Sequence, residues 1–355
     1  MEGYKLTIFL TGTTGFLGGK LLTNLLETTN QNLFVLVRDI EKAEHLVTQL
    51  PGNAKSRVRL FRGDITKPNC GLSNEEIKEL TGNVDLFYHL AALVKFDEEL
   101  REELFTINYD GTKHALELAK MLSVKKFFYI STAYTVGKHE YGVEKLYPID
   151  VPGHNPYEES KVKSEHLALS YSDYMDVSIF RPSIIVGDSV TGEADSEFTL
   201  YGFMRALDVF KRRIARTADN PNTIYRVLGS KHSTSNFVPV NYVADILAYA
   251  ESNAEANTIY NITNPKPATN HKILSLIKDA LDFDKLEIIE AAEPGLLTSE
   301  ESRLNEMIQV FNDYLSRSFD FDDKNTQRLI ENSTIRHLEM PDKTLKMIIE
   351  AYFDL

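Results

Sequence analysis

The sequence has 355 residues, of which 43% are hydrophobic and 26% are charged, as is ordinary for a folded globular protein. The formal net charge of -13 argues against a general nucleic-acid binder, because affinity for phosphates comes from clustered lysine and arginine. A single cysteine, Cys70, excludes a disulfide framework within the chain and favours a reducing cytoplasm. Cys70 follows a predicted strand, and we expect a half-exposed thiol in a loop, with no catalytic role.

The N-terminus leads directly from residues 1–4 into an apolar strand, without the basic start and cleavage site of a secretory signal. No apolar run approaches the ~20 residues that a membrane helix needs. We therefore expect a cytoplasmic protein with no membrane span.

Short apolar runs alternate with helical patterns along the first half of the chain. Strands are expected at residues 6–10, 33–37, 58–61, 84–90, 126–130 and 177–180. Helices are expected at residues 16–27, 40–50, 73–80, 100–122 and 156–171. This order predicts an α/β fold, a doubly wound parallel sheet of the Rossmann type with helices on both faces.

The regular alternation weakens after Gly187 and returns in part near Phe237. Residues 1–187 are therefore predicted to form the dinucleotide-binding domain, to which residues 237–264 return. Residues 188–236 and 265–355 are predicted to build a smaller, mainly helical domain that binds the substrate.

A glycine-rich segment follows the first predicted strand and opens the first helix. Its small residues allow a tight turn and close approach of a pyrophosphate, and the helix N-terminus supplies N–H donors. The alternative is a glycine turn without a ligand, but the strand-loop-helix context favours dinucleotide binding. The predicted contacts are Gly12, Thr14, Gly15, Phe16, Leu17 and Gly18.

The end of the second strand indicates which dinucleotide is bound. Arg38 occupies the position where a basic residue accommodates a 2′-phosphate, which favours NADP (as NADPH). Asp39 follows it and keeps NAD open, because an acidic residue there suits a ribose diol.

Two further strand ends carry candidate cofactor contacts. Asp64 is placed to accept a hydrogen bond from an adenine amine, with Ile65 against the ring, although a helix-capping role explains Asp64 nearly as well. Ala91 and Ala92 end the fourth strand, and their small side chains suit close approach of the cofactor. His89 is interpreted as a buried, hydrogen-bonded histidine.

The catalytic candidates are Tyr157 and Lys161, which lie one turn apart on a predicted helix. A neighbouring ammonium favours the phenolate, which would make Tyr157 a proton donor or acceptor near neutral pH. Such pairs arise by chance on many helices, so their partners matter. Thr132, at the end of the fifth strand, is placed to hold a substrate carbonyl oxygen.

Two more groups of residues are expected at the same edge of the sheet. Asn108 lies in the long predicted helix before the fifth strand, where we expect it to kink the helix and hold a water in a proton relay. The sixth strand ends beside the site, which adds four predicted cofactor contacts: Arg181, Pro182, Ser183 and Ile184. No metal ligands are predicted.

The ordered motifs TGTTGFLG, GDIT, HLAA, NYDGT, STAYTVG, YEESK and RPSIIVG resemble those of an extended short-chain dehydrogenase/reductase. GDITKPNCGLS and YHLAALVKF resemble the branch that contains thioester reductases and fatty acyl-CoA reductases. The resemblance implies that Thr132, Tyr157 and Lys161 are the family's hydroxyl, tyrosine and lysine. It also implies NADPH-dependent reduction of an acyl thioester, carried by coenzyme A or a carrier protein, to an aldehyde or alcohol.

The sequence also allows two other functions. One is an epimerase, dehydratase or dehydrogenase acting on a nucleotide sugar or another hydroxyl substrate. The other is a dinucleotide-sensing protein without catalysis, against which the presence of both Tyr157 and Lys161 counts. The assembly state also stays open, with a homodimer as one option.

The densest basic run of the chain is Phe210 to Arg216. Coenzyme A and phosphopantetheine carry phosphates, so this run is a candidate docking site for the carrier. A solvated helix face is the alternative explanation.

Overall fold

The computed structural model describes residues 5–48, 52–195, 199–217, 222–290 and 296–354. Seven strands form one parallel sheet in the order β12-β7-β5-β4-β1-β2-β3. The strands are β1 (Thr7–Thr11), β2 (Asn32–Val37), β3 (Val58–Arg62), β4 (Leu86–His89), β5 (Lys126–Ile130), β7 (Asp176–Pro182) and β12 (Ile259–Ile262). This sheet confirms the predicted fold class, and the strand order reverses between β1 and β4.

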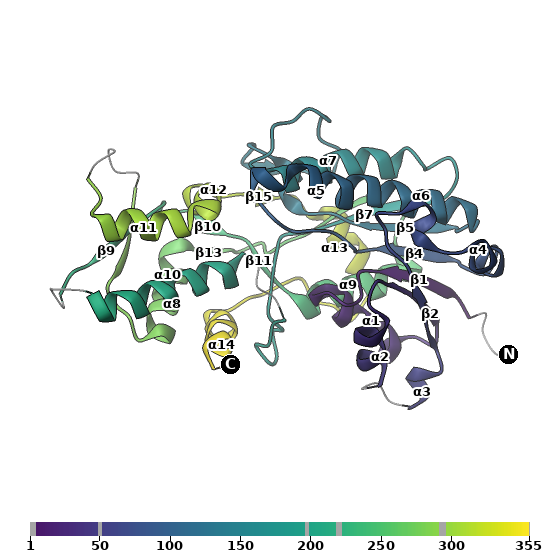
Figure 1. Cartoon of the computed structure of the whole chain (residues 1–355), viewed down its shortest axis with the longest axis horizontal. Helices are drawn as coiled ribbons and strands as arrows, with labels where there is room; N and C mark the ends of the chain where they lie inside the picture. Colours follow the sequence, from purple (N-terminus) through teal and green to yellow (C-terminus); the bar gives the residue numbers. More distant parts are fainter. Residues whose placement is uncertain (1–4, 49–51, 196–198, 218–221, 291–295, 355) are drawn as a thin grey trace.

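Both faces of the sheet are buried, because successive apolar side chains of a strand point to opposite faces. In β1, Ile8 and Leu10 enter one core and Phe9 the other. Figure 1 shows one helical layer above the sheet and another below it. The upper layer contains α4 (Asn74–Leu80), α5 (Arg101–Phe105), α6 (Gly111–Met121) and α7 (Pro156–Leu169). The lower layer contains α1 (Phe16–Thr28), α2 (Ile40–Thr48), the short α3 (Gly52–Lys55) and α9 (Val240–Asn253).

The predicted helix over residues 100–122 is interrupted by a π-helical segment, Thr106–Asp110. Asn108 lies inside it, and its carbonyl oxygen accepts hydrogen bonds from the hydroxyls of Thr112 and Ser164. Side chains that bond to backbone carbonyls disturb the regular helical ladder. The predicted irregularity at Asn108 is therefore present.

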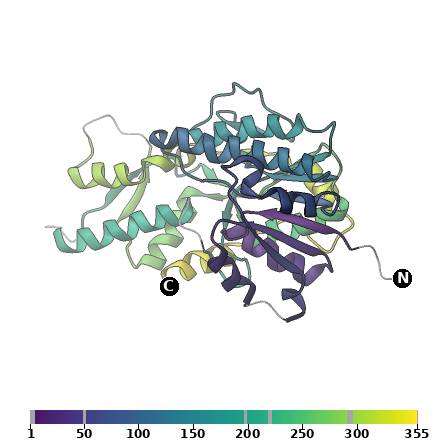
Figure 2. The same cartoon turned by 45° about the vertical axis from the view of Figure 1, so that its right-hand side comes forward.

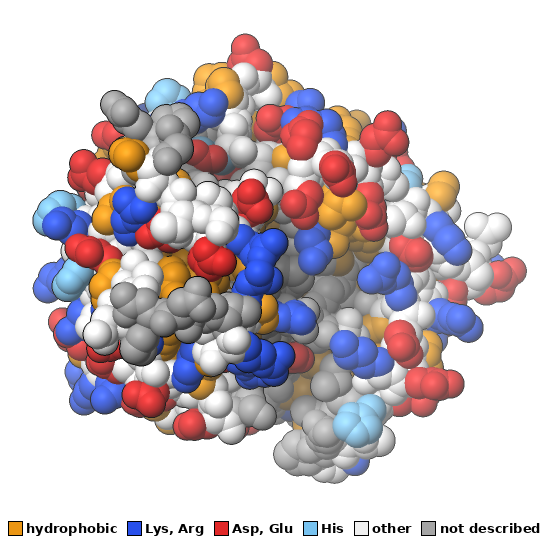
Figure 3. Space-filling view, turned by 60° about the vertical axis from the view of Figure 1, so that its left-hand side comes forward, with side chains coloured by type: hydrophobic (Ala, Val, Ile, Leu, Met, Phe, Trp, Pro, Cys, Tyr) orange, Lys and Arg blue, Asp and Glu red, His pale blue; other side chains and the backbone are white. Residues whose placement is uncertain are grey.

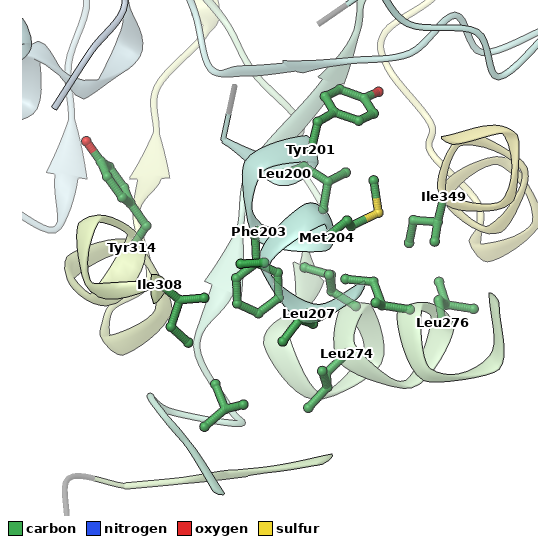
Figure 4. Close-up of a cluster of buried hydrophobic side chains, with 14 of the residues drawn as sticks. Leu200, Tyr201, Phe203, Met204, Leu207, Leu274, Leu276, Ile308, Tyr314 and Ile349 are labelled. Atoms are coloured by element: carbon green, nitrogen blue, oxygen red, sulfur yellow. The ribbon is translucent and has the colours of Figure 1, made fainter. Parts of the chain in front are cut away.

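A smaller lobe stands beside the sheet (Figures 1 and 2). Its core is a separate cluster of buried side chains, including Phe203, Met204, Leu207 and Leu274, which Figure 4 shows in close-up. Its helices are α8 (Leu200–Thr217), α10 (Asn270–Leu281), α11 (Ser299–Met307), α12 (Asn312–Ser316) and α14 (Asp342–Phe353). Short strand pairs complete it or link it to the sheet: β8 (Ile184–Val186) with β11 (Phe237–Pro239), β9 (Tyr225–Leu228) with β14 (Leu286–Ile289), and β10 (Thr234–Ser235) with β13 (Ala268–Thr269).

The C-terminal part of the chain does not stay in the smaller lobe. Strand β15 (Asp320–Phe321) pairs with β6 (Tyr141–Gly142), and α13 (Lys324–Ile330) then packs against β12 and α9. Leu329 and Leu338 belong to the core of the large domain. The assignment of all of 265–355 to the substrate domain is therefore wrong for this stretch. An apolar helix face has the same sequence pattern whichever core it packs against. The local sequence therefore does not show to which domain this helix belongs.

The expectation of a half-exposed Cys70 is also wrong. Its side chain is fully buried in the core on the α6 face, and burial raises the pKa of the thiol to about 12. Asn69 and Cys70 both adopt positive φ angles, which turn this short loop inward. Such a thiol is unreactive at neutral pH.

Within the residues that the structure describes, no helix combines the length and the apolar character needed to cross a membrane.

Candidate active site

A cavity of about 460 Å³ opens at the carboxyl ends of the central strands, where the strand order reverses. Ligands of open α/β sheets bind at such a switch point. Of the predicted site residues, Asn108 and Arg181 do not line it. The others do: Gly12, Thr14, Gly15, Phe16, Leu17, Gly18, Arg38, Asp64, Ile65, Ala91, Ala92, Thr132, Tyr157, Lys161, Pro182, Ser183 and Ile184.

The turn between β1 and α1 is packed too tightly for side chains at two of its glycines. Gly12 has a φ of +80°, and a Cβ there would lie 2.6 Å from the backbone nitrogen of Ala91. A Cβ on Gly18 would overlap the carbonyl oxygen of Gly12. At Gly15, the N-cap of α1, the nearest atom would be 3.4 Å away, and no side chain caps the helix. The helix N-terminus therefore offers free N–H groups to the cavity, which fits a pyrophosphate.

His89 lies behind this turn and is structural. One ring nitrogen is 2.9 Å from the hydroxyl of Thr11, and the other is 3.2 Å from the hydroxyl of Thr112. Burial and the nearby Lys161 lower the pKa of His89 to about 3, so the ring is neutral. The interpretation of His89 as a buried, hydrogen-bonded histidine is confirmed.

Arg38 and Asp39, at the end of β2, have different tasks. Arg38 is exposed, lines the cavity and has no ion-pair partner among the described residues. The carboxylate of Asp39 accepts a hydrogen bond from the backbone nitrogen of Lys42, at 3.0 Å, and so caps α2. Of these two residues, Arg38 lines the cavity and Asp39 does not.

Asp64 closes its own loop while lining the cavity. One carboxylate oxygen accepts hydrogen bonds from the backbone nitrogen and hydroxyl of Thr66, at 2.9 and 2.8 Å. Burial acts to raise the pKa of Asp64, but these bonds and the charge of Arg38 hold it below its usual value. Asp64 is therefore an anionic acceptor, and its adenine contact stays a prediction.

Lys161 reaches from α7 to the end of β5. Its ammonium donates a hydrogen bond to the carbonyl oxygen of Ile130, at 2.8 Å, and lies 4.7 Å from the centre of the Tyr129 ring. Burial lowers the pKa of Lys161 to about 7, and the charge of Glu165 opposes this only in part.

Tyr157 and Thr132 face the same cavity from α7 and β5. Burial and the neighbouring Glu158 raise the pKa of Tyr157, and Lys161 makes no resolved contribution to it. The expected depression of this pKa by Lys161 is therefore not found in the protein alone, because the amine is turned to Ile130. The oxygen of Thr132 accepts a hydrogen bond from the backbone nitrogen of Tyr134, so its proton can be donated to a ligand.

Asn108 is a positioning residue and does not reach the cavity. Its side-chain oxygen accepts from the backbone nitrogen of Leu93, at 2.7 Å, and its amide donates to the carbonyl of Leu93 and the hydroxyl of Ser160, both at 3.0 Å. These bonds occupy the amide and tie the loop after β4 to α7. The predicted water relay through the Asn108 side chain is therefore not supported.

Arg181 also lies outside the cavity, so its predicted cofactor contact is wrong. The side chain is fully buried and forms a two-bond ion pair with Glu165, at 2.8 and 2.6 Å. Nη1 donates to the carbonyl of Val143, and Nη2, one of the two nitrogens bonded to Glu165, also donates to the carbonyl of Lys145. A strand-end position could not show that the guanidinium turns inward to a partner on α7.

Ser131, Phe96 and Tyr314 line the cavity but were not predicted from the sequence. Ser131 and the predicted Ser183 have buried hydroxyl oxygens without a hydrogen-bond partner among the described residues. Buried polar atoms are rarely left unpaired, so these hydroxyls fit the polar groups of a bound dinucleotide and substrate. Phe96 and Tyr314 give the same cavity an aromatic wall. Ser131 was recognisable by its place beside Thr132, whereas Phe96, in the loop after β4, and Tyr314, in α12, have no local signal.

The fold and this site define an extended short-chain dehydrogenase/reductase. The family model described as male sterility protein, an NAD-binding domain, matches residues 10–247, and the chain belongs to this family. The predicted class, an NAD(P)-dependent oxidoreductase of the extended type, is thereby confirmed.

Among curated proteins, the fatty acyl-CoA reductase wat of Drosophila melanogaster is 27% identical over 236 residues. The alignment covers 54% of this chain and 46% of the fly enzyme, so the chain spans about half the length of that relative.

Two solved structures share the fold. The terminal R domain from the myxalamid PKS-NRPS biosynthetic pathway has a TM-score of 0.80 at 22% identity, covering 99% of this chain and 91% of that one. UDP-glucuronic acid 4-epimerase from Bacillus cereus, in complex with NAD, has a TM-score of 0.68 at 18% identity, covering 98% and 96%.

The low pKa of Lys161 predicts how the stability of the fold depends on pH. The unfolded chain binds a proton at this lysine up to its usual pKa of 10.5, whereas the folded chain releases it near 7. Between these two pH values the unfolded state thus holds more protons than the folded state. The buried lysine therefore lowers the free energy of unfolding below pH 7, and this loss disappears as the pH rises toward 10.5. Lys161→Met should therefore have its largest gain in Tm, relative to wild type, at or below neutral pH.

Thermal unfolding from pH 6 to pH 10 measures this difference, and Lys163→Met on the same helix is the matched control. The Lys163 variant shows the effect of removing a partly exposed lysine from this helix. A Tm difference for Lys161→Met that does not change with pH would show that burial does not depress its pKa.

Proposed function

We propose that the chain reduces an acyl thioester, using NADPH as the hydride donor. The observation that carries this proposal is the meeting of Thr132, Tyr157 and Lys161 in one cavity with the uncapped N-terminus of α1. The fly relative, a fatty acyl-CoA reductase, supports the thioester as substrate. The cavity also has an apolar side with Val94, Phe96 and Ile107, which suits an acyl group.

In this mechanism the hydroxyls of Thr132 and Tyr157 donate hydrogen bonds to the thioester carbonyl oxygen. The raised pKa of Tyr157 keeps its proton in place until negative charge develops on that oxygen, as an acid in a reduction requires. NADPH, when bound, supplies the hydride to the carbonyl carbon. Loss of the thiol from the resulting hemithioacetal gives an aldehyde, and a second reduction of this kind would give an alcohol.

Lys161 is proposed to bind the nicotinamide ribose, since its ammonium already lies at the cavity wall at the end of β5. A ribose hydroxyl that accepts from this ammonium would favour its charged form. The charged lysine would then assist loss of the Tyr157 proton. The low pKa of Lys161 in the protein alone is therefore compatible with a cationic lysine in the complex.

The preference for NADPH is proposed from the different positions of Arg38 and Asp39 at the end of β2. Arg38 is available for a 2′-phosphate, whereas Asp39 caps α2 and is not directed to a ribose diol. Basic side chains also gather near the middle of the face in Figure 3, although the chain is acidic as a whole. Such a face suits the phosphates of coenzyme A or of a phosphopantetheine carrier.

Docking of the carrier on the basic run of α8 stays a prediction, and two of the basic side chains already have partners within the protein. Lys211 donates to the carbonyl of Leu281, and Arg212 pairs with Asp208 at 2.6 Å. Arg212 is 73% exposed, so its pair with Asp208 is a weak surface interaction that a phosphate can replace.

Tyr157→Phe tests the proposed acid. Turnover of an acyl-coenzyme A should fall by about 10²–10⁴-fold, because the carbonyl oxygen loses its proton donor, while the Kd for NADPH should stay close to that of wild type. Steady-state kinetics and calorimetry measure the two quantities. Tyr171→Phe, beyond the end of α7 and outside the cavity, is the matched control, and an unimpaired Tyr157→Phe would refute the assignment.

Arg38→Ala tests the cofactor preference. A hydrogen bond to a charged group contributes about 1.5–3 kcal/mol, so the Kd for NADPH should rise at least about tenfold. The Kd for NADH, which lacks the 2′-phosphate, should change little. Arg62→Ala, at the end of the neighbouring strand and outside the cavity, should alter neither Kd. Equal losses for both cofactors would contradict the preference for NADPH.

A further inference from the structure

A second, small cavity of about 40 Å³ lies in the core of the smaller lobe, directly behind the catalytic cavity. Ile184, Thr199 and Tyr314 line both cavities, so these residues form the wall between them. Figure 4 shows Tyr314 at the edge of the buried cluster, with its hydroxyl pointing away from Phe203 and Ile308. The Tyr314 ring is thus part of the wall between the two cavities.

The second cavity is built for an apolar occupant. Most of its wall consists of buried aliphatic and aromatic side chains, among them Phe203, Leu274 and Ile288. Its two buried amide and hydroxyl side chains are already satisfied: Ser235 donates to Asn270 at 2.8 Å, and Asn270 donates to the carbonyl of Leu315 at 2.8 Å. A polar ligand would find few free partners there, whereas a hydrocarbon chain would only displace void space.

Tyr314 is held in place by a buried hydrogen-bond network at the start of α7. Its hydroxyl donates to a carboxylate oxygen of Glu158, at 2.6 Å, and accepts from the amide of Asn155, at 2.8 Å. Glu158 is fully buried, and its other carboxylate oxygen accepts hydrogen bonds from the backbone nitrogen and ring of His154, both at 2.8 Å. Rotating Tyr314 away would leave the carboxylate oxygen of Glu158 that it contacts without this donor, which is costly for a buried polar atom.

Contacts with two other aromatic rings also hold the ring of Tyr314 in place. It contacts Tyr134 in a T-shaped pair with ring centres 5.1 Å apart, and Phe96 at 5.7 Å. Phe96 in turn lies 6.1 Å from the ring of Tyr157. Tyr314, which comes from α12 in the other lobe, therefore lines the same cavity as Tyr157, and Phe96 contacts both rings.

We propose that Tyr314 is the residue that sets the length of the acyl chain the enzyme accepts. Its ring closes the second cavity, so a short acyl group fits in the catalytic cavity and a longer one must displace the ring from its network. This inference rests on the proposed thioester substrate. It predicts a preference for short acyl groups and a shift to longer ones when the ring is removed.

The test compares binding of butanoyl-, octanoyl- and dodecanoyl-coenzyme A to wild type, Tyr314→Ala, Tyr314→Leu and Tyr314→Phe. The Kd from calorimetry, with NADP⁺ present, is the primary readout, and turnover with NADPH is the second. In the Ala and Leu variants we expect the ratio of dodecanoyl to butanoyl affinity to rise at least about tenfold, the scale on which apolar pockets discriminate. Tyr314→Phe keeps the ring but loses the hydrogen bonds to Glu158 and Asn155, so its profile should lie between that of wild type and those of the Ala and Leu variants.

Two controls separate this role from a general loosening of the lobe. Tyr225→Leu alters a buried tyrosine of the same lobe that lines neither cavity, and it should leave the length profile unchanged. The Kd for NADPH verifies that each variant is folded at the catalytic cavity. The Leu variant, which keeps an apolar side chain, serves if the Ala variant does not fold.

The outcomes distinguish the two proposals. A length profile that is the same in wild type and in the Ala and Leu variants would overturn the role of Tyr314. A shifted binding profile without turnover of any thioester by wild type would retain that role and overturn the proposed reduction. Absence of binding for every acyl-coenzyme A would overturn both.

Discussion

The close approach of the β1–α1 turn to the end of β4 is the constraint on which the site depends. Neither Gly12 nor Gly18 has room for a side chain, because the turn packs against the backbone at Ala91 and against itself. This packing places the free N–H groups of α1 at the edge of the sheet. On the other side, Asn108 ties the loop after β4 to α7 through Leu93 and so holds the helix of Tyr157 against the same edge.

The electrostatics of the cavity follow from burial more than from charge pairing. Burial lowers the pKa of Lys161 to about 7 and raises that of Tyr157. A protonated tyrosine is the form that a carbonyl reduction needs, and the nearby hydroxyls of Ser131 and Ser183 still lack partners among the described residues. The protein alone thus holds polar groups that a bound cofactor and substrate would complete, which is the preorganisation that favours catalysis over mere binding.

The sequence predicted most of the sheet, and all of the predicted site residues except Asn108 and Arg181 line the cavity, because the relevant signals are local. A glycine motif after a strand, or small residues at a strand end, must lie at the carboxyl edge of a parallel sheet. The errors concern side chains whose direction depends on distant partners. Arg181 turns inward to Glu165, the amide of Asn108 is occupied by Leu93, and Cys70 is buried by an inward turn. Tyr314 lies so far from Tyr157 along the chain that no spacing could connect them.

The proposed reduction requires that hydride passes from the nicotinamide ring to a thioester carbonyl carbon in this cavity. NADPH that carries deuterium at the transferable ring position reports this transfer, with an acyl-coenzyme A as substrate and with mass spectrometry of the product. We expect one deuterium on the former carbonyl carbon of the aldehyde, together with one equivalent of free coenzyme A thiol. Cofactor oxidation without deuterium in the product, or deuterium in a product that keeps its thioester, would contradict it.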